Sequence, residues 1–431
     1  MPLRPPYSSS ARSSASANVL EPQDNTRQRL IAAAATLIAE GGIAAASARA
    51  IAAQAGSSAS AINYNFGNIE RLLLTVFEQG VEETRVWLAS RTREIAALPR
   101  TADGAVWALT HLILAWTSQA RSRALVYQEA LAANAGQGAA AAWTRLWQDF
   151  WTETAALFGL DPIDGRMMHV LFESEALYHL STWSPALEAA ALTEMVEHFA
   201  SIWLDTPPRA PWGAAALAAE AAGARPYNSV PPAALRIAKA AAEVVEEKGL
   251  TGLTHRAVAT RAGVTTGSVT HHFRSIEDLV AGAIRGQVQL MTEQVRAQSN
   301  PPPSVDEIQT VEQYFEALRH HVASGAPPSP VLRRRRLFLA AVRREDLAAS
   351  GAVIRFSQGG TTRDTLERIF SLPESDLVLH AGVVSRLLSA IWFACAGDAE
   401  PARARTAVFD RIETRLRARL TQPGTEGAGG R

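Results

Sequence analysis

The stretch ARAIAAQAGSSASAINYNFGNIERLL, residues 48–73, returns as HRAVATRAGVTTGSVTHHFRSIEDLV, residues 255–280. The offset of 207 residues holds without a gap from residue 29, and 15 of the 45 positions in 29–73 are identical. Six of these identities are alanines, which an alanine-rich composition partly supplies by chance, and nine are other residues. The chain therefore contains an internal duplication, and one fold must be sought for both copies.

Each copy begins with an amphipathic helix. Apolar residues recur at i, i+3, i+4, i+7 and i+8, as Leu30, Ala33, Ala34, Leu37 and Ile38 in the first copy and Ile237, Ala240, Ala241, Val244 and Val245 in the second. This spacing places one apolar stripe on an α-helix. Gly42 and Gly249 follow the stripes, and a glycine in the left-handed conformation commonly ends a helix.

Three further helices are predicted in each copy from their capping residues. Side chains that accept hydrogen bonds from free amides precede them: Ser47, Ser58 and Asn68 in the first copy, and Thr254, Thr265 and Ser275 in the second. Gly56 and Gly263 separate the two short helices. Two short helices joined through a glycine turn and supported by a longer amphipathic helix form a helix-turn-helix unit. The sequence predicts two such units.

At these residues the chain resembles the TetR family of bacterial one-component transcriptional regulators. The family pattern has an IA…AG helix, then a short helix ending in an aromatic residue and Phe, followed by glycine or serine, Lys, Glu and Leu. The resemblance implies a three-helix DNA-binding domain followed by a helical domain for ligand binding and dimerisation. The 431 residues hold this arrangement twice.

We therefore expect an all-α protein with two tandem TetR-like units. Helical periodicity outside the duplicated segments predicts helices at 103–120, 121–134, 139–158, 164–181 and 184–204, and at 304–323, 330–350, 352–371, 374–397 and 402–420. The expected domains are a disordered arm (1–25, or a transit peptide), helix-turn-helix domain 1 (26–80), helical domain 1 (81–204), a linker (205–232), helix-turn-helix domain 2 (233–285), helical domain 2 (286–420) and a disordered tail (421–431).

Composition narrows the class of protein. The chain has 42 basic and 42 acidic residues, so overall charge gives no reason to expect a nucleic-acid coat or a membrane-surface protein. Cys395 is the only cysteine, which excludes an intrachain disulfide and favours a reducing compartment. The longest apolar stretch, 105–117, is shorter than the ~20 residues of a membrane helix. We expect a cytoplasmic protein, associated with the nucleoid when bound to DNA and without a membrane partner.

A recognition helix places side chains against base edges while flanking groups hold phosphates. The expected DNA-contacting residues are Ser47, Arg49, Ser57, Ser58, Ser60, Asn63, Tyr64 and Asn65 in the first copy, and Thr254, His255, Arg256, Thr265, Thr266, Ser268, Thr270, His271 and His272 in the second. Neither recognition helix offers an arginine for guanine, so readout should rely on smaller polar side chains and thymine methyl contacts.

The two contact sets differ at nearly every position, which predicts an asymmetric operator on double-stranded DNA. We expect one chain to fold as an intramolecular pseudo-dimer. The resemblance implies that the last two helices of each unit pack together as a four-helix bundle, and the candidates for an internal bundle are 164–204 and 374–420. The alternative is a homodimer with four DNA-binding units. The resemblance favours repression.

A second reading stays open. Ile69 and Ile276 stand where the family usually has a phosphate-contacting lysine, as expected if one or both units had lost DNA binding and the chain were a helical interaction protein. Between 233 and 274 six basic residues face three acids, whereas 27–67 has three arginines and one glutamate. The sequence has no Gly-rich phosphate loop, nucleophile elbow or clustered His-carboxylate motif, so we expect no enzyme activity.

Aromatic residues in the first helical domain point to an effector. Trp143, Trp147 and Trp151 repeat every four residues, and Trp107 and His111 do so on another helix. They predict a pocket for a small hydrophobic or aromatic effector, with core packing as the alternative for each tryptophan. We expect no cofactor. We also expect no metal, since His169 and Glu173 form only a single pair of candidate ligands. The run Arg333–Arg336 is interpreted as a solvated or domain-facing helix surface.

Overall fold

The computed structural model describes residues 22–134, 137–204, 206–207, 209–223, 231–296, 307–323, 325, 327, 329–370 and 372–420. The predicted tail and most of the predicted arm lie outside these residues, whereas 22–25 begin the first helix. The described residues form helices joined by turns and loops, and they contain no β-strand. The all-α fold is confirmed.

The first helix-turn-helix unit consists of α1 (Pro22–Gly41), α2 (Ala48–Gln54), α3 (Ala59–Phe66) and the long α4 (Ile69–Ile95). Ser47 accepts a hydrogen bond from the amide of Ala50 at 3.3 Å, and Asn68 accepts one from the amide of Arg71 at 2.8 Å. These are the predicted caps of α2 and α4. Gly42 ends α1 with φ of 78°, a value that favours glycine.

The second unit repeats this order with α11 (Pro232–Lys248), α12 (His255–Ala262), α13 (Thr266–His272) and α14 (Ile276–Arg296). Thr254, Thr265 and Ser275 cap their helices with hydrogen bonds of 3.0–3.1 Å, as predicted. A Cβ at Gly286 would lie 2.1 Å from the carbonyl oxygen of Ala238. Glycine is therefore required where α14 crosses α11.

The helical body follows each unit. In the first half it comprises α5 (Ala102–Ser118), α6 (Arg121–Asn134), α7 (Gly138–Leu157), α8 (Pro162–Tyr178) and α9 (Pro185–Trp203), close to the five predicted helices. In the second half it comprises α15 (Val311–Ala323), α16 (Ser329–Val342), α17 (Ala348–Phe356), α18 (Gly360–Ile369), α19 (Glu374–Ala394) and α20 (Pro401–Leu420). The single helix predicted at 352–371 is wrong: Gly359, with φ of 97°, separates α17 from α18.

The segment predicted as a linker contains a helix, α10 (Ala214–Ala221), which packs on α9. Glu194 of α9 accepts hydrogen bonds from the amides of Trp212 and Gly213, each at 2.6 Å. These bonds satisfy amides at the N-terminus of α10. The chain is thus anchored to the first half before it enters the second.

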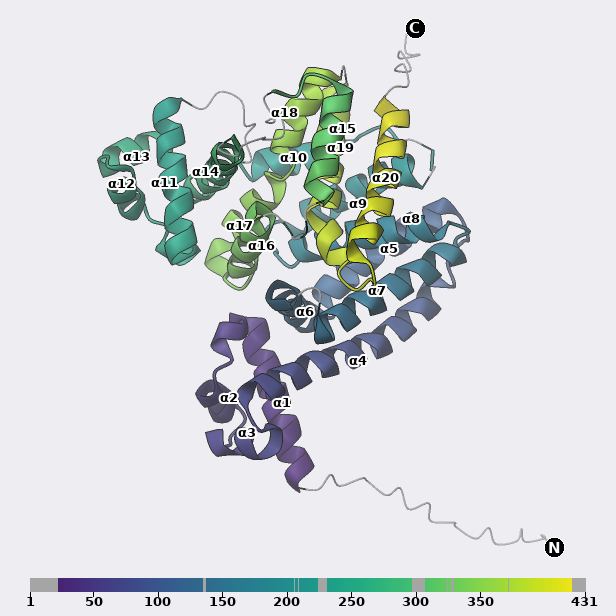
Figure 1. Cartoon of the computed structure of the whole chain (residues 1–431), viewed down its shortest axis with the longest axis vertical. Helices are drawn as coiled ribbons and strands as arrows, with labels where there is room; N and C mark the ends of the chain where they lie inside the picture. Colours follow the sequence, from purple (N-terminus) through teal and green to yellow (C-terminus); the bar gives the residue numbers. More distant parts are fainter. Residues whose placement is uncertain are drawn as a thin grey trace, which may run out of the picture.

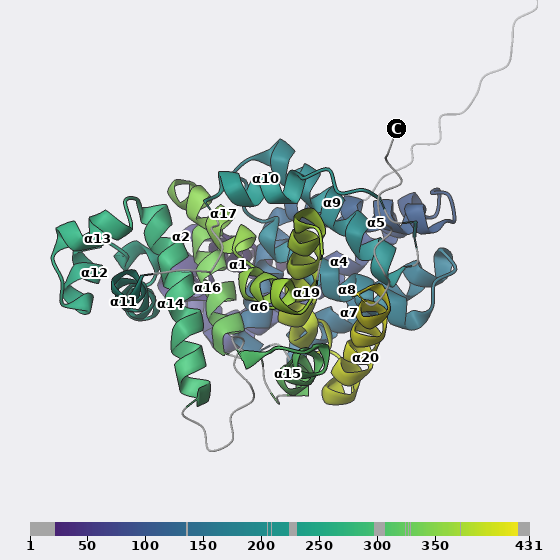
Figure 2. The same ribbon diagram turned by 90° about the horizontal axis from the view of Figure 1, so that it is seen from above.

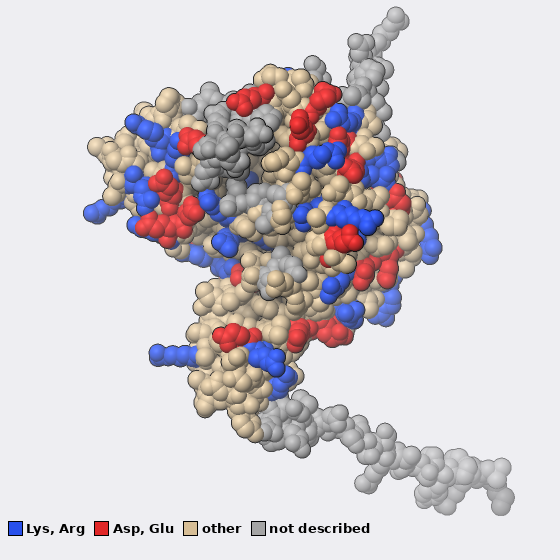
Figure 3. All heavy atoms as spheres, in the orientation of Figure 1, with Lys and Arg blue, Asp and Glu red and all other residues tan. Residues whose placement is uncertain are grey.

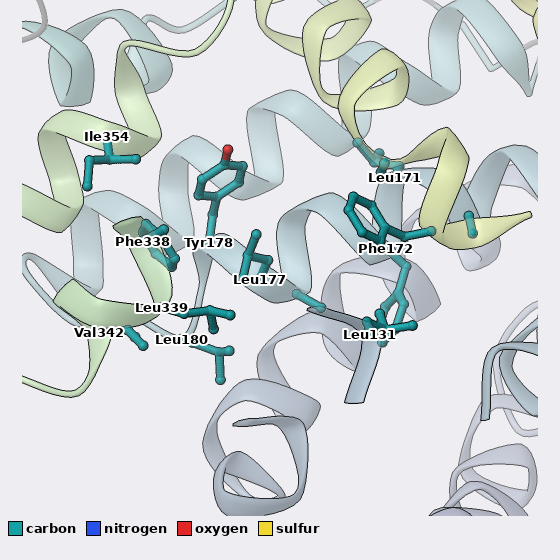
Figure 4. Close-up of a cluster of buried hydrophobic side chains, with 14 of the residues drawn as sticks. Leu131, Leu171, Phe172, Leu177, Tyr178, Leu180, Phe338, Leu339, Val342 and Ile354 are labelled. Carbon is teal, nitrogen blue, oxygen red and sulfur yellow. The ribbon is translucent and has the colours of Figure 1, made fainter. Parts of the chain in front are cut away.

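We call residues 26–204 unit 1 and residues 233–420 unit 2. Their bodies are packed together: α8 contacts α19 and α20, and α9 contacts the same two helices (Figures 1 and 2). Figure 4 shows Leu177 and Tyr178 beside Phe338, and the Tyr178 and Phe338 rings meet edge to face with centroids 5.0 Å apart. The buried apolar residues of both units form one continuous cluster.

Helix α19 lies at the centre of this cluster. It is the one helix among the described residues that is long and apolar enough to cross a membrane, yet 83% of its most apolar window is buried inside the protein. Its apolar character follows from being surrounded by other helices.

Candidate DNA interface and the cavity of unit 2

The two recognition helices lie on the same side of the molecule. Figure 1 shows α2 and α3 at the lower left and α12 and α13 at the upper left, each pair on the outer side of its unit. Every residue predicted to contact DNA is exposed or half-buried, and none is buried. The surface needed for reading DNA is therefore open on both units.

In unit 1, α3 is fixed by apolar contacts on its inner face. Ile62 is 1% exposed, and the Arg27 guanidinium lies 5.0 Å from the centre of the Phe66 ring. Tyr64, on the other face, is 74% exposed. This arrangement presents the tyrosine and its polar neighbours outward.

The predicted cap at Ser58 is wrong. Its hydroxyl makes no capping hydrogen bond and lies 2.8 Å from the hydroxyl of Ser60 instead. The two hydroxyls satisfy each other, and both side chains remain exposed at the start of α3.

In unit 2, α13 is fixed by Val269, which is fully buried, and by the Thr265 cap. The His271 and His272 rings stand edge to face with centroids 5.0 Å apart. His255 has a structural contact, because its Nε2 donates a hydrogen bond of 2.8 Å to the carbonyl oxygen of Phe273. It ties α12 to the end of α13, so only part of its ring remains for DNA.

Ile69 and Ile276, at the positions where a lysine was expected by resemblance, are partly buried and pack against the apolar core. They anchor the first turns of α4 and α14 and contribute no charge at the outer surface. Figure 3 shows the first helix-turn-helix unit as a largely uncharged surface with a few basic and acidic groups. Arg49 and Arg256 are exposed on α2 and α12 and supply matched positive charges.

All but one of the ion pairs between the described residues of the two units have the same polarity. The acids come from unit 1 and the arginines from unit 2 in Glu129–Arg343 (2.6 Å), Asp164–Arg411 (2.8 Å), Glu173–Arg335 (2.8 Å), Glu175–Arg386 and Glu188–Arg355 (3.3 Å). Glu173 and Glu175 are fully buried. Burial opposes ionisation of Glu175, but Arg386, His179 and Arg355 hold the pKa of this carboxyl well below its usual range. Arg166–Asp398 has the opposite polarity.

Helix α16 touches both DNA-binding units. Near its start, Arg333 pairs with Glu246 of α11 at 3.3 Å. Just beyond its end, Arg343 donates a hydrogen bond of 3.1 Å to the carbonyl oxygen of Ala39 in α1. Of the two interpretations of the arginine run, a solvated or a domain-facing surface, the domain-facing one applies to Arg335, because it contacts Glu173 of unit 1. The contact of Arg343 with the other copy had no signal in the sequence.

A cavity of about 310 Å³ lies in unit 2. Its walls come from α14, α15, α16, α18 and α19, with one wall from α8 of unit 1. Leu177, Ile284, Leu388 and Phe393 give it an apolar interior, and Arg334 also lines it.

The tryptophans predicted to line an effector pocket are placed elsewhere. Trp143, Trp147 and Trp151 are fully buried, and Trp147 packs against Trp116 with ring centroids 5.0 Å apart. Trp107 is 53% exposed and stacks on His111 at 4.7 Å. None of these five side chains lines the cavity of unit 2. The buried indoles pack in the interior of unit 1, which is the arrangement that the core-packing alternative describes.

No metal was predicted at His169 and Glu173, and Glu173 makes other contacts. Glu173 accepts a hydrogen bond of 2.8 Å from the Tyr127 hydroxyl and pairs with Arg335. Burial lowers the pKa of His169 to about 3. Cys395 is buried, and burial raises the pKa of its thiol to about 12.

The geometry defines an all-α protein with two helix-turn-helix DNA-binding domains on a shared helical body. Residues 30–76 and 237–283 each match the model of the bacterial regulatory proteins of the tetR family. The chain thus carries two DNA-binding domains of the tetR family in tandem, and it is a DNA-binding transcription regulator.

The solved structures that are similar to this chain include that of the multidrug binding protein EbrR complexed with malachite green. It is 27% identical over 43% of this chain and 98% of its own, with a TM-score of 0.24. No curated protein is significantly similar to the chain.

Proposed function

We propose that the protein is a ligand-responsive repressor that reads one asymmetric operator with two non-identical recognition helices of a single chain. It would act in the cytoplasm on chromosomal DNA. The outward side chains of α3 and α13 support this proposal, since Asn63 and Tyr64 correspond to Thr270 and His271. Different side chains at equivalent positions select different base edges.

The main support for a pseudo-dimer is the polarity of the ion pairs between the units, in which most acids come from unit 1 and most arginines from unit 2. If two copies of unit 1 met through this surface, the buried carboxylates of Glu173 and Glu175 would have no arginine partners. An unpaired buried charge costs several kcal/mol, about 3–5 when one partner of a pair is removed. Pairing of unit 1 with unit 2 is therefore strongly favoured over pairing of like units.

Selection of binding sites from a random double-stranded DNA library tests the function. We expect an enriched site with two unlike halves, spaced by about one or more helical turns of 34–36 Å. A helical interaction protein without DNA-binding activity would enrich no site, and that result would reject the proposal.

Matched variants assign the two halves. Asn63→Ala should relax base preference only in one half, and His271→Ala only in the other, each at a cost of about 1–3 kcal/mol for a lost base contact. Both side chains are exposed, so the fold should be unaffected. If either variant altered both halves equally, the asymmetric reading would be rejected.

A further inference from the structure

The charged side chains in the mostly apolar lining of the unit 2 cavity are basic. None of the described residues that line it is an aspartate or glutamate. Arg335 is neutralised by Glu173, whereas Arg334 donates a hydrogen bond of 2.8 Å to the Ser357 hydroxyl and has no carboxylate partner among the described residues. A cation would meet no counter-charge in this lining, but an anion would meet Arg334.

Three polar atoms of the lining residues are buried and without a hydrogen-bond partner among the described residues. They are the hydroxyls of Ser174 and Tyr314 and Oε1 of Gln358. Buried polar atoms are normally hydrogen-bonded, so unpartnered groups around a cavity mark where a ligand supplies the missing partners. Gln358 is held in place by hydrogen bonds from Nε2 to Ser385 and Ser389, which leaves Oε1 as the open acceptor.

The interior of unit 1 is packed differently. The buried indoles of Trp116, Trp143, Trp147 and Trp151 occupy its interior. A Cβ at Gly80 of α4 would lie 2.4 Å from the Trp143 ring, which shows how tightly that ring is packed against α4.

We propose that the chain has one effector site, in the cavity of unit 2, and that it takes a small organic acid with an apolar body whose carboxylate pairs with Arg334. This inference deepens the proposed function by naming the ligand class and restricting the response to one site per chain. A cavity of about 310 Å³ suits a molecule of about a dozen heavy atoms.

Helix α16 provides the route from this site to DNA. It carries Arg334 in the cavity wall, while Arg333 pairs with Glu246 of the second helix-turn-helix unit and Arg343 binds the first. Helix α14 adds Ile284 and Gln287 to the wall and continues from the second DNA-binding domain. A ligand that shifts α16 against α14 changes how the two recognition helices are spaced.

Calorimetric titration of the full chain, without DNA, with three compounds of one shape tests the site: 4-phenylbutanoate, 4-phenylbutanamide and 4-phenylbutylamine. We expect the acid to bind with one site per chain and at least about tenfold more tightly than the amide, because a charge-assisted hydrogen bond to Arg334 is lost in the amide. The amine should bind more weakly still.

Arg334→Gln should reduce the preference for the acid over the amide to about one, while Arg334→Lys should keep part of it. Arg336→Gln is the matched control, because Arg336 belongs to the same run but is exposed and does not line the cavity. The inference is overturned if the acid fails to bind, if the amine binds as well as the acid, if two sites per chain appear, or if Arg334→Gln leaves the preference intact.

These titrations are independent of operator binding. A protein that selects an asymmetric DNA site but does not prefer the acid keeps its proposed role as a DNA-binding regulator and loses this ligand class. A protein that prefers the acid but selects no DNA site loses the proposed role and keeps the ligand site.

Discussion

Units 1 and 2 share an order of helices but differ in their interiors. Unit 1 is filled by tryptophans that pack edge to face, as Trp147 and Trp116 do. Unit 2 contains a cavity lined by Leu388, Arg334 and residues of α8 from unit 1. After a duplication, one copy can become a rigid support while the other keeps a space for a ligand, because the shared core stabilises both.

The largest expected effect comes from removing the buried ion pairs that Glu175 of unit 1 makes with unit 2. Glu175→Gln removes a buried carboxylate that Arg386 and Arg355 face, and the two arginines would be left without their shared counter-charge. We expect a loss of about 3–5 kcal/mol in the free energy of unfolding, measured by urea denaturation. The control is Glu374→Gln in the exposed Arg363 pair, which should cost less than about 1 kcal/mol. Equal losses of unfolding free energy in the two variants would refute the claim that buried ion pairs hold the two units together.

The interiors themselves can be compared by shortening one side chain in each. Trp147→Phe in the filled unit should cost about 1–3 kcal/mol, because the smaller ring leaves a void in a packed interior. Leu388→Val in the cavity wall should cost about 1 kcal/mol or less, because part of its surface already faces open space. Thermal unfolding of both variants measures the two losses of stability. A larger loss for Leu388→Val than for Trp147→Phe would contradict the idea that unit 1 is filled and unit 2 contains a cavity.

Low pH should destabilise the interface between unit 1 and unit 2. His198 of unit 1 and His380 of unit 2 lie 2.6 Å apart between Nε2 and Nδ1, and burial lowers the pKa of His380 to about 4 and that of His198 well below its usual value. The unfolded chain binds these protons near pH 6.5 and the folded chain does not, so stability is full above about pH 6.5 and falls as pH drops toward 4.

Arg419 lowers the pKa of both rings, and the backbone at Asp376 raises that of His380. His380→Gln should flatten the dependence of unfolding free energy on pH in this window. A variant with the same slope as the parent protein would show that other groups control acid stability.

The smallest effects are expected at the DNA surface. Arg49→Ala and Arg256→Ala remove exposed, matched cations from α2 and α12. Each should reduce by about one the slope of log affinity against log salt concentration, without changing the preferred bases. If only one variant changed the slope, the arginine removed in the other variant would be shown not to approach a phosphate.

The fold was largely predictable because local signals and the duplication agree. The caps at Ser47, Asn68, Thr254 and Thr265 follow from the chemistry of hydroxyl and amide side chains before a helix. The helix α10 had a signal as well, since 214–221 is mostly alanine, the strongest helix former. The glycine pair at 359–360 marked the break between α17 and α18.

The exposed DNA-contact residues could also be found from their positions in the repeat, whereas the interior could not. Spacing by four shows that Trp143, Trp147 and Trp151 share a face, but it does not show whether that face packs or lines a space. The cavity is formed by six helices from different parts of the sequence. Only the structure shows that Arg335 is paired with Glu173 and that Arg334 is not.

The mass of the protein in solution, alone and bound to one copy of the selected site, tests the central claim most directly. We expect a complex of one chain of 46.2 kDa with one DNA duplex, since a single chain supplies both recognition helices. Two chains on every duplex, with no complex of one chain at any protein concentration, would contradict it.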